Sequence, residues 1–337
     1  MSSAGGAPAR LRIGLIGASK VAYSAILAPA RTITGVEVCA VAARDPARAE
    51  QYAAEHAIRR VHADYESLVR DPDIDLVYVG TPPVGHAPSA LAAIASGKHV
   101  LVEKPFALSN AEARQVAEAA RASGRFVFEA MHSVHHPLFR RIVELVASGE
   151  IGALRRLSAS FTLAPQPEDD IRWQRDLGGG ALMDMGVYPL AWCRHLAGEP
   201  LHATRVATQV WGEVDSRFEA TLEFRGGVTA EIACDLRTAG YSAHLAVEGD
   251  AGELQVDNPL APQRGHSLAI RTASGSRTET IDGITSYEAQ LEAIRATILH
   301  GAPFALEPDD YVRSMAAIEL VRARFPAELG GGDPQSI

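Results

Sequence analysis

The chain has 337 residues, of which 47% are hydrophobic, 22% charged and 6% aromatic. These proportions are typical of a soluble globular protein, and the length suits two domains. The 41 Asp and Glu residues outnumber the 32 Lys and Arg residues, and the resulting net charge of −9 argues against nucleic acid or an anionic membrane as a partner.

The cysteines and the chain ends give no sign of processing. Cys39, Cys193 and Cys234 are widely spaced in apolar sequence, so we expect buried thiols rather than disulfides or a zinc site. We expect no signal peptide, because the first ten residues lack an apolar run behind a basic segment, and no stretch approaches the ~18 apolar residues of a membrane span. A cytoplasmic protein is expected, with a frayed end from residue 330 to 337.

Residues 1–130 alternate between two kinds of segment. Short runs rich in Val and Ile are typical of buried parallel strands, and the Ala-rich amphipathic runs between them are typical of helices. The predicted strands are Leu11–Ile16, Val36–Ala42, Leu76–Val79, His99–Val102 and Phe126–Glu129, and the predicted helices are Val21–Thr32, Ala47–Glu55, His86–Ser96 and Asn110–Ala122. This alternation predicts an α/β domain of the Rossmann type, with a doubly wound parallel sheet and crossover helices.

The pattern changes in residues 131–337, where longer segments alternate apolar and polar residues, as in an antiparallel sheet with one covered face. The predicted strands are Leu154–Leu163, Thr204–Gly212, Phe218–Arg225, Val228–Asp235, Ala243–Glu248 and Glu253–Val256, and the predicted helices are Pro137–Ser148, Ala181–Leu196, Ser286–His300 and Pro308–Arg324. Gly226-Gly227 predicts a hairpin, and Pro189 predicts a kink near Tyr188. We expect a C-terminal α+β domain with a large, mostly antiparallel open sheet, whose last helix is free to pack back on the first domain.

A glycine-containing segment follows the first strand and opens the first helix. A dinucleotide-binding loop needs glycine at its tight turn and small residues where it approaches the pyrophosphate and where the helix packs on the strand. Gly17, Ser19 and Ala22 occupy these three positions, although serine at the second one weakens the signal. The candidate cofactor-binding residues of this loop are Gly17, Ala18, Ser19, Lys20 and Val21, and a tight turn without a ligand is the alternative.

The end of the second strand bears on which dinucleotide binds. An acidic residue there would bind the ribose hydroxyls of NAD, but the chain has Ala42-Ala43-Arg44-Asp45. Arg44 is placed to pair with a 2′-phosphate, and Asp45 is better interpreted as the cap of the next helix. NADP(H) is therefore favoured over NAD(H).

Further polar segments follow predicted strands at the edge of the sheet where ligands bind in such folds. The prolines of Thr81-Pro82-Pro83 fix a turn there, and His86 is either placed to orient this loop or is a lone surface histidine.

The pair Glu103-Lys104 ends the fourth strand. We expect it to emerge into the crevice, because burying it unpaired would cost several kcal/mol, and a structural salt bridge is the alternative. Pro105 keeps Lys104 out of helical geometry.

A third constellation follows the glycines at positions 178–180. Asp184 and Tyr188 are four residues apart and share one face of the predicted helix, on which His195 continues the stripe if Pro189 does not break it. A tyrosine on such a helix is usually a core residue, but a free lysine elsewhere in the chain allows the interpretation that this tyrosine is catalytic. A phenol has an ordinary pKa of about 10, so catalysis near neutral pH calls for a nearby cation, and Lys104 is the candidate.

Taken together, these motifs resemble the Gfo/Idh/MocA oxidoreductase family, which includes glucose–fructose oxidoreductase and inositol dehydrogenase. The residues that carry the resemblance are the Gly17 loop, Thr81-Pro82-Pro83 with His86, Glu103-Lys104-Pro105, Leu177 to Leu182 with Asp184, Gly186 and Tyr188, and Val247-Glu248-Gly249 with Gly252. Tyr188, in place of histidine, is similar to the branch of dihydrodiol and D-xylose dehydrogenases and nucleotide-sugar 3-ketoreductases. Ser19 and Pro83 depart from the family pattern.

The resemblance implies roles for individual residues. Lys104, Tyr188 and Asp184 would be catalytic, and His132 would join these three in binding substrate. Cofactor would contact the glycine loop, Arg44, Thr81, Pro82, Pro83, His86, Glu103, Lys104, Met131, Arg172 and Trp173. No metal is implied, and the family commonly pairs through its open sheet, so a homodimer or homotetramer is expected.

The leading hypothesis is reversible hydride transfer between NADP(H) and a hydroxyl or carbonyl carbon of a sugar, sugar derivative or cyclic diol. Tyr188 would exchange the hydroxyl proton while Lys104 holds the same oxygen and lowers the pKa of the phenol. Two alternatives stay open, a glycoside hydrolase whose nicotinamide cycles internally and a non-catalytic dinucleotide-sensing regulator. Arg172 and Arg237 are candidate contacts for an anionic substrate, and a surface position or a contact with cofactor is the alternative for both.

Overall fold

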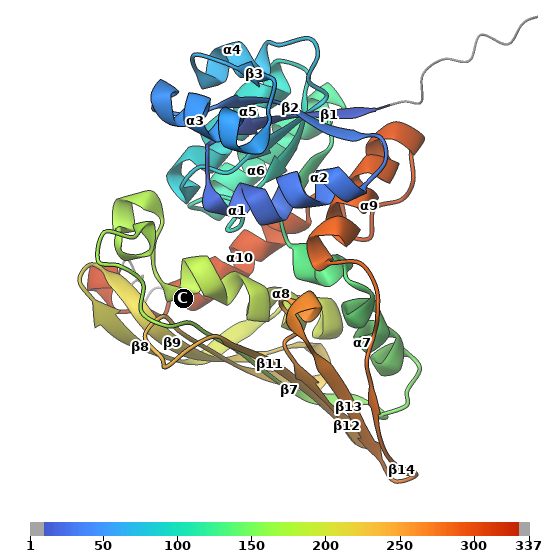
Figure 1. Ribbon diagram of the computed structural model, residues 1–337. Helices are drawn as coiled ribbons and strands as arrows, with labels where there is room; N and C mark the ends of the chain where they lie inside the picture. The colour runs from blue at the N-terminus through green and yellow to red at the C-terminus, as the bar shows by residue number, and fades with distance from the viewer. Residues whose placement is uncertain (1–9, 330–337) are drawn as a thin grey trace, which may run out of the picture.

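The computed structural model describes residues 10–329, and it contains two sheets with helices between and around them (Figure 1). The expected N-terminal tail, apart from Arg10, and the expected frayed end at 330–337 lie outside the described residues. The first sheet is parallel, with strand order β3-β2-β1-β4-β5-β6. Its strands are β1 (Leu11–Ile16), β2 (Val36–Ala42), β3 (Arg60–Val61), β4 (Leu76–Val79), β5 (His99–Val102) and β6 (Val127–Glu129).

Helices cover both faces of this parallel sheet, as predicted for a doubly wound domain. They are α1 (Lys20–Ala22), α2 (Ala28–Thr32), α3 (Pro46–His56), α4 (Tyr65–Val69), α5 (His86–Ala95) and α6 (Asn110–Ser123), with a π-helical segment η1 (Tyr23–Leu27) joining α1 to α2. The Asp45 carboxylate accepts a hydrogen bond from Ala47 N at 3.0 Å, so the predicted cap of α3 is confirmed.

The second sheet has eight strands in the order β14-β13-β12-β11-β7-β10-β9-β8, antiparallel except between β7 and β10. Its strands are β7 (Leu154–Thr162), β8 (His202–Trp211), β9 (Val214–Glu223), β10 (Thr229–Asp235), β11 (Ser242–Gly249), β12 (Gly252–Asp257), β13 (Ser267–Thr272) and β14 (Gly275–Glu279). The predicted hairpin at Gly226-Gly227 joins β9 to β10. The fold class predicted from the sequence is confirmed.

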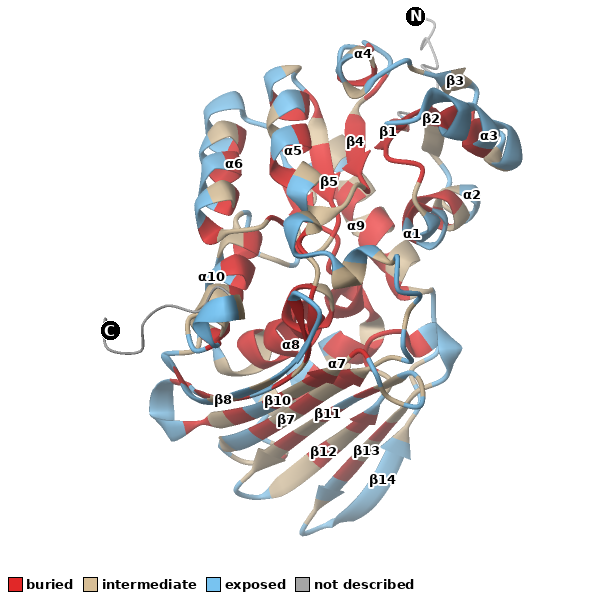
Figure 2. Cartoon of the chain, turned by 90° about the vertical axis from the view of Figure 1, so that its left-hand side faces the viewer, coloured by how far each residue is buried: buried red, intermediate tan, exposed pale blue. Residues whose placement is uncertain are grey.

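One face of the second sheet packs against helices, and its opposite face is open (Figure 2). The helices of this part of the chain are α7 (Pro137–Ala147), α8 (Val187–Ala197), α9 (Ser286–His300) and α10 (Asp310–Arg322). The shorter segments are η2 (Pro83–Gly85), η3 (His132–His135), η4 (Ile171–Trp173), η5 (Arg175–Leu177), η7 (Arg225–Gly227), η8 (Pro262–Arg264) and η9 (Ala327–Leu329), with a second π-helical segment, η6 (Leu182–Gly186), directly before α8.

The kink predicted near Tyr188 is placed differently in the structure. Pro189 lies three residues into α8, which continues η6 without a break, so the missing N–H removes a hydrogen bond inside the helix while the helical path continues through it. The irregular geometry is instead the π-helical segment η6, upstream of the proline.

The two final helices connect the two sheets. Leu291 and Ile294 of α9 are fully buried in the core of the first domain, and α9 packs beside α2. Helix α10 packs against both α6 of the first domain and α8 of the second, as the sequence allowed for the last helix. The first domain therefore meets the second sheet through α8, α9 and α10 (Figure 1).

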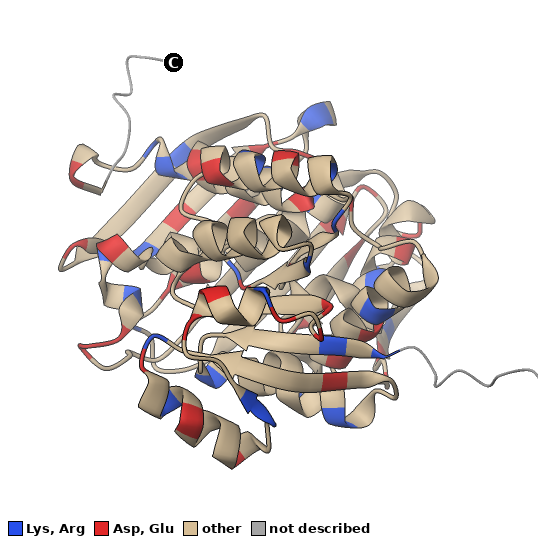
Figure 3. Ribbon diagram, turned by 90° about the horizontal axis from the view of Figure 1, so that it is seen from above, with Lys and Arg blue, Asp and Glu red and all other residues tan. Residues whose placement is uncertain are grey.

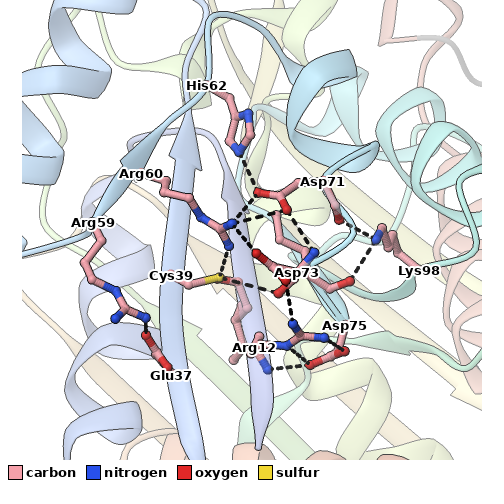
Figure 4. A network of polar contacts seen from close by, with 12 residues as sticks. Arg12, Glu37, Cys39, Arg59, Arg60, His62, Asp71, Asp73, Asp75 and Lys98 are labelled. Carbon is pink, nitrogen blue, oxygen red and sulfur yellow. Dashed lines mark hydrogen bonds and ion pairs between the residues drawn. The ribbon is translucent and has the colours of Figure 1, made fainter.

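A network of charged groups closes the N-terminal edge of the first sheet (Figure 4). Arg12 binds both carboxylate oxygens of Asp75, and Arg60 pairs with Asp71 and Asp73. The buried Lys98 ammonium donates to the carbonyl oxygens at residues 71 and 74. These contacts lie at the edge opposite the predicted ligand crevice, so we interpret them as structural.

Lys and Arg are interspersed with Asp and Glu over the elements seen from above (Figure 3). None of the helices within residues 10–329 is both long and apolar enough to cross a membrane. In the same range, no three His, Cys, Asp or Glu side chains are grouped so as to hold a metal ion.

Candidate active site

The candidate site lies at the carboxyl ends of β1, β4, β5 and β6, where four loops meet the start of the helix formed by η6 and α8. The loop after β1 is held by hydrogen bonds to both neighbouring strands, with Gly17 N donating to Ala42 O and Gly80 N donating to Ile16 O, each at 2.8 Å. Gly17 has φ +97°, and a Cβ there would come within 2.8 Å of Gly80 O, so both backbone angle and space require glycine.

The residues of this loop fit a dinucleotide. Ser19 is the N-cap of α1, but its side chain caps no backbone group, and its hydroxyl and that of Thr81 are buried without a hydrogen-bond partner within residues 10–329. Lys20 and Val21 follow as exposed residues of the first turn. Free donors at the start of a helix suit a pyrophosphate, which these residues would hold.

Helix α3 holds the same loop by hydrogen bonds, on the side where the adenosine of a bound dinucleotide would lie. Arg48 donates two hydrogen bonds to Ala18 O, at 2.9 and 3.2 Å, and the Tyr52 hydroxyl donates to Ser19 O at 3.0 Å. The sequence analysis missed both residues, although their i,i+4 spacing behind Asp45 was a usable signal. Arg44 is exposed at the end of β2, where the side chains at 42 and 43 are alanines.

His86 links two of the loops. Its Nε2 lies 2.8 Å from Thr81 O and its Nδ1 lies 2.8 Å from Pro105 O, so the ring bridges the loops after β4 and β5. Burial lowers the pKa of His86 to about 4, and a neutral ring then donates to one of these two carbonyls. The interpretation as a lone surface histidine is wrong, because His86 is 1% exposed.

Glu103 corrects a second expectation. Its carboxylate does not emerge into the crevice but is buried, where it accepts hydrogen bonds from the Tyr78 hydroxyl at 2.8 Å and from Lys104 N at 3.2 Å. These two hydrogen bonds offset the cost of burying the Glu103 carboxylate, and the sequence did not reveal them. The carboxyl thus faces Tyr78 rather than the position expected for cofactor.

Lys104 is the centre of the candidate catalytic cluster. Its Nζ donates to Asp184 Oδ1 at 2.8 Å and to the Asp184 carbonyl at 2.9 Å, although 80 residues separate them. Arg172 donates from Nε to the other carboxylate oxygen at 2.6 Å and also pairs with Asp170. Burial alone would raise the pKa of Asp184, but the two cations lower it to about 2. Arg172 is consequently occupied by carboxylates rather than free for an anionic substrate.

Tyr188 lies next to this cluster, with Lys104 Nζ 5.3 Å from the centre of its ring. The expectation that Lys104 lowers the pKa of the phenol is wrong for the protein alone, because burial raises that pKa well above its ordinary value, and Glu103 and Asp184 add to the effect. The ammonium lies over the ring face rather than at the phenol oxygen, and it is neutralised by Asp184. His195 does not join the cluster but lies beside Asp310 of α10.

The glycine run before η6 holds Arg172 in position. A Cβ at Gly179 would come within 2.5 Å of Arg172 O, and one at Gly180 would come within 2.2 Å of Asp215 Oδ1. Gly180 N donates to Arg172 O at 2.9 Å, and Asp215 accepts from Leu182 N at 2.7 Å. Glycine is therefore needed for the close approach that brings Arg172 to Asp184.

The remaining predicted residues lie around the same crevice, except that Trp173 is tied to the neighbouring loop. Met131 is buried at the end of β6, and His132 follows it with Nε2 3.5 Å from the Tyr188 hydroxyl. Trp173 Nε1 donates to Gln166 O at 3.4 Å and packs on the main core. Arg237 lies over the ring of Trp211, 3.5 Å from its centre, at an exposed end of the second sheet.

Comparison with known proteins gives the class of this chain. Residues 11–131 match the oxidoreductase family with an NAD-binding Rossmann fold, and residues 139–255 match the GFO/IDH/MocA C-terminal domain. The chain therefore belongs to the Gfo/Idh/MocA oxidoreductase family. It is an NAD(P)-dependent enzyme that transfers a hydride between nicotinamide and a hydroxyl or carbonyl carbon. The predicted family, fold and class of reaction are confirmed.

Individual relatives narrow the branch of the family. The chain is 38% identical to a dTDP-3,4-didehydro-2,6-dideoxy-alpha-D-glucose 3-reductase of Streptomyces antibioticus, over 81% of this chain and 83% of that one. It is 32% identical to D-xylose 1-dehydrogenase (NADP(+)) 2 of Haloferax volcanii, over 92% and 96% of the two chains. The crystal structure of a 3-ketoreductase from Actinomadura kijaniata in complex with NADP and TDP-benzene superposes with a TM-score of 0.86 at 28% identity, covering 94% of this chain and 100% of that one.

Proposed function

We propose that this enzyme uses NADPH to reduce a ketone on the ring of a sugar or sugar derivative, with Lys104, Tyr188 and Asp184 as its catalytic residues. The observation that carries the proposal is the contact of Lys104 with a carboxylate oxygen and the carbonyl oxygen of Asp184, beside the ring of Tyr188. This cluster lies at the edge of the sheet where the glycine loop lies. The 38% identity to a sugar 3-reductase supports the substrate class.

In this mechanism the raised pKa of Tyr188 is useful. Reduction of a carbonyl needs a neutral acid, and burial keeps the phenol protonated at neutral pH. Tyr188 donates its proton to the carbonyl oxygen, and Lys104 donates a hydrogen bond to the same oxygen and stabilises its developing negative charge. Asp184 holds the Lys104 ammonium in place. Bound NADPH supplies the hydride that completes the alcohol.

We propose NADPH rather than NADH as the preferred cofactor. The end of β2 carries no carboxylate to hold the ribose hydroxyls, because Asp45 is occupied as the cap of α3. Arg44 is exposed there, and Arg48 lies one helical turn further on. A 2′-phosphate would meet positive charge at this position.

The charge near the site supports a nucleotide-linked substrate over a free sugar. Arg264 ends η8, and its charge acts on His132, Tyr287 and Tyr241 at the crevice. Arg264 is exposed, so its guanidinium is accessible to a diphosphate.

The proposal is tested with purified protein and a panel of substrates. NADPH and NADH are titrated by fluorescence, and the tighter cofactor is offered with a dTDP-linked 3-keto-sugar, D-xylose and a cyclic trans-diol. Turnover of the keto-sugar, with a raised KM in Arg264→Ala for it but not for D-xylose, is the expected result. Tight NADPH binding without net turnover of any of them would contradict the reductase and favour the internally cycling hydrolase or the sensor.

We further propose that the enzyme assembles through the open face of its second sheet and acts in the cytoplasm. Ser158, Ser160, Ala233 and Ala246 lie on this face, and no helix covers it within residues 10–329. Such small side chains allow two sheets to approach closely.

The division into domains of residues 1–130 and 131–337 remains a proposal, and α9 and α10 pack across it.

A further inference from the structure

A chain of hydrogen-bonding groups leads from the Tyr188 hydroxyl to the surface. The hydroxyl lies 3.5 Å from His132 Nε2, and His132 Nδ1 lies 2.9 Å from Ser286 Oγ. Gln263 Oε1 lies 3.2 Å from Ser286 Oγ and 3.4 Å from Ser286 N. His132 and Ser286 are 3% and 0% exposed, whereas Gln263 is exposed, so the chain begins at the buried phenol and ends at solvent.

The contacts of Ser286 assign the proton of His132 to one nitrogen in the resting arrangement. Ser286 N–H can only donate, so the atom of Gln263 that faces it is the amide oxygen, which also accepts from the Ser286 hydroxyl. The lone pair of Ser286 Oγ then accepts from His132 Nδ1–H. A neutral ring protonated at Nδ1 has a bare Nε2, which is the atom that faces Tyr188.

The surroundings keep this arrangement in place. The His132 ring stacks on Tyr287, with 4.0 Å between ring centres. Ser286 and Tyr287 open α9, whose Thr285 and Glu288 form a capping box, and Glu288 also accepts a hydrogen bond from Thr32 of α2 at 2.7 Å. Burial and the charge of Lys104 lower the pKa of His132 to about 3, so the ring is neutral at physiological pH.

We propose that Tyr188, His132 and Ser286 form a proton relay that connects the catalytic phenol to solvent, an inference that rests on the proposed role of Tyr188. When an alcohol is oxidised, its hydroxyl proton moves to the Tyr188 oxygen as the phenol proton moves to His132 Nε2. The Nδ1 proton moves to Ser286 Oγ, and the Ser286 hydroxyl proton leaves to a water molecule that replaces Gln263 Oε1 as its acceptor when this exposed side chain turns away. Reduction runs the same transfers in reverse, from the arrangement in which His132 carries its proton on Nε2 and the Ser286 hydroxyl donates to Nδ1.

The balance of protons explains why a histidine with a low pKa serves here. Each group gains one proton as it loses another, so the ring passes from one neutral tautomer to the other and never becomes an imidazolium. After the transfers, the Ser286 hydroxyl donates to His132 Nδ1 instead of Gln263. In the arrangements before and after, every member of the relay has a hydrogen-bond partner. Because they act through Tyr188, His132 and Ser286 are positioning residues rather than contacts of the reacting carbon.

The first test needs no substrate. In ¹⁵N-histidine-labelled enzyme, with the His132 signal assigned by its loss in His132→Gln, we expect a neutral ring protonated at Nδ1. This preference should weaken in Ser286→Ala. A His132 ring protonated on both nitrogens would overturn the relay whatever reaction the enzyme catalyses.

The second test uses the fastest substrate of the panel above, in mixtures of H₂O and D₂O. Wild type should show a curved dependence of kcat on deuterium content, because several protons move together, whereas Ser286→Ala should show a linear one. We expect Ser286→Ala to lower kcat by roughly 10- to 100-fold with little change in KM, less than the roughly 10²–10⁴ expected on removing the acid itself. Ser286→Thr, which keeps the hydroxyl, should recover most of the loss.

Thr297→Ala is the matched control, since it removes another buried hydroxyl from α9, one whose hydrogen bond within residues 10–329 goes to Ala293 O. It should leave kcat and the curved dependence unchanged. Unchanged kcat and curvature in Ser286→Ala, while Tyr188→Phe is inactive, would overturn the relay and leave the proposed function standing. Full activity in Tyr188→Phe would remove the proposed function itself.

Discussion

At the scale of residues, Asp184 connects the charges of the candidate site, because its two carboxylate oxygens bind Lys104 and Arg172. Lys104, Asp184 and Tyr188 were candidates from their positions after a strand and on a helix, and the structure brings them together. The sequence did not show that Asp184 binds Arg172 as well, or that Glu103 turns inward to Tyr78. Such pairings depend on side-chain directions that only tertiary packing determines.

Ser286 shows a further limit of the sequence at this scale. It lies 98 residues after Tyr188 in the chain, at the start of a helix that the sequence placed correctly. The capping box of Thr285 and Glu288 was a local signal for the helix start. Nothing local linked that start to His132.

Asp184 should contribute stability that depends on pH. Its pKa in the folded protein, about 2, lies below the ordinary 3.8, so its contribution is complete above pH 4 and is lost as the pH falls toward 2. We expect Asp184→Asn to lower the free energy of unfolding at pH 7 by roughly 2–3 kcal/mol, because two cations lose a charged acceptor. Urea unfolding at pH 7, 4 and 3 measures the difference between the two proteins, and a difference that grows toward pH 3 would contradict this account.

Arg44 should determine the preference for NADPH. Loss of one charge-assisted hydrogen bond to the 2′-phosphate, about 1.5–3 kcal/mol, predicts a Kd for NADPH raised roughly 10- to 100-fold in Arg44→Ala, with the Kd for NADH nearly unchanged. Arg70→Ala removes the same charge from an exposed position on the end of α4 and serves as the control. Equal effects of Arg44→Ala on both cofactors would reject the assignment.

At the scale of elements, the pattern of apolar residues was sufficient to place the strands that are buried on both faces. Strands β1, β2, β4 and β5 have the predicted bounds, because their burial on both faces makes them continuous apolar runs. The sequence missed β14, an exposed edge strand without an apolar face, the two-residue β3 and the single-turn α4, because short or exposed elements carry too little apolar signal to be predicted. It also missed β13, although Leu268 and Ile270 of that strand are buried.

Glu129 joins three elements and should make stability depend on pH in the opposite sense. It ends β6, accepts a hydrogen bond from Phe106 N at 3.1 Å and lies near Asp310 at the start of α10. Burial and the Asp310 carboxylate raise its pKa to about 8, so the folded state binds one proton more than the unfolded state between pH 4.5 and 8. The free energy of unfolding therefore falls as the pH rises through this range.

The isosteric Glu129→Gln should remove that component. Its free energy of unfolding should increase relative to that of wild type from pH 5 to 8. The increase should be on the order of a few kcal/mol, at about 1.4 kcal/mol per unit of pKa difference. The pKa of Asp215 is raised to about 7 by burial and acts in the same direction, but it is present in both proteins and cancels. A pH-independent difference would show that Glu129 is ionised in the folded state.

At the scale of the whole molecule, the sequence predicted the two architectures and their order. It allowed the last helix, α10, to pack back on the first domain, but it did not indicate that α9 also packs there. The site depends on that return, since α9 brings Ser286 and Tyr287 to His132. Two segments that lie 154 residues apart in the chain thus meet in one crevice.

The open sheet should hold two copies of the chain together. A charge at the centre of that face would be buried without a partner in a sheet-to-sheet dimer, so Ala233→Arg should shift the protein to monomers. Light scattering after size exclusion measures the mass, with Ser274→Arg on the exposed turn between β13 and β14 as the control. A monomeric wild type, or an unchanged mass in Ala233→Arg, would exclude this interface.

The central claim is that Tyr188 is the acid of an NADPH-dependent reduction, and its most direct test is the rate of hydride transfer in Tyr188→Phe. Single-turnover oxidation of NADPH by the keto-sugar of the panel should slow by roughly 10²–10⁴ in the variant. The Kd for NADPH should stay unchanged, because Phe keeps the buried ring and loses only the hydroxyl. A variant that transfers hydride at the rate of wild type would contradict the account.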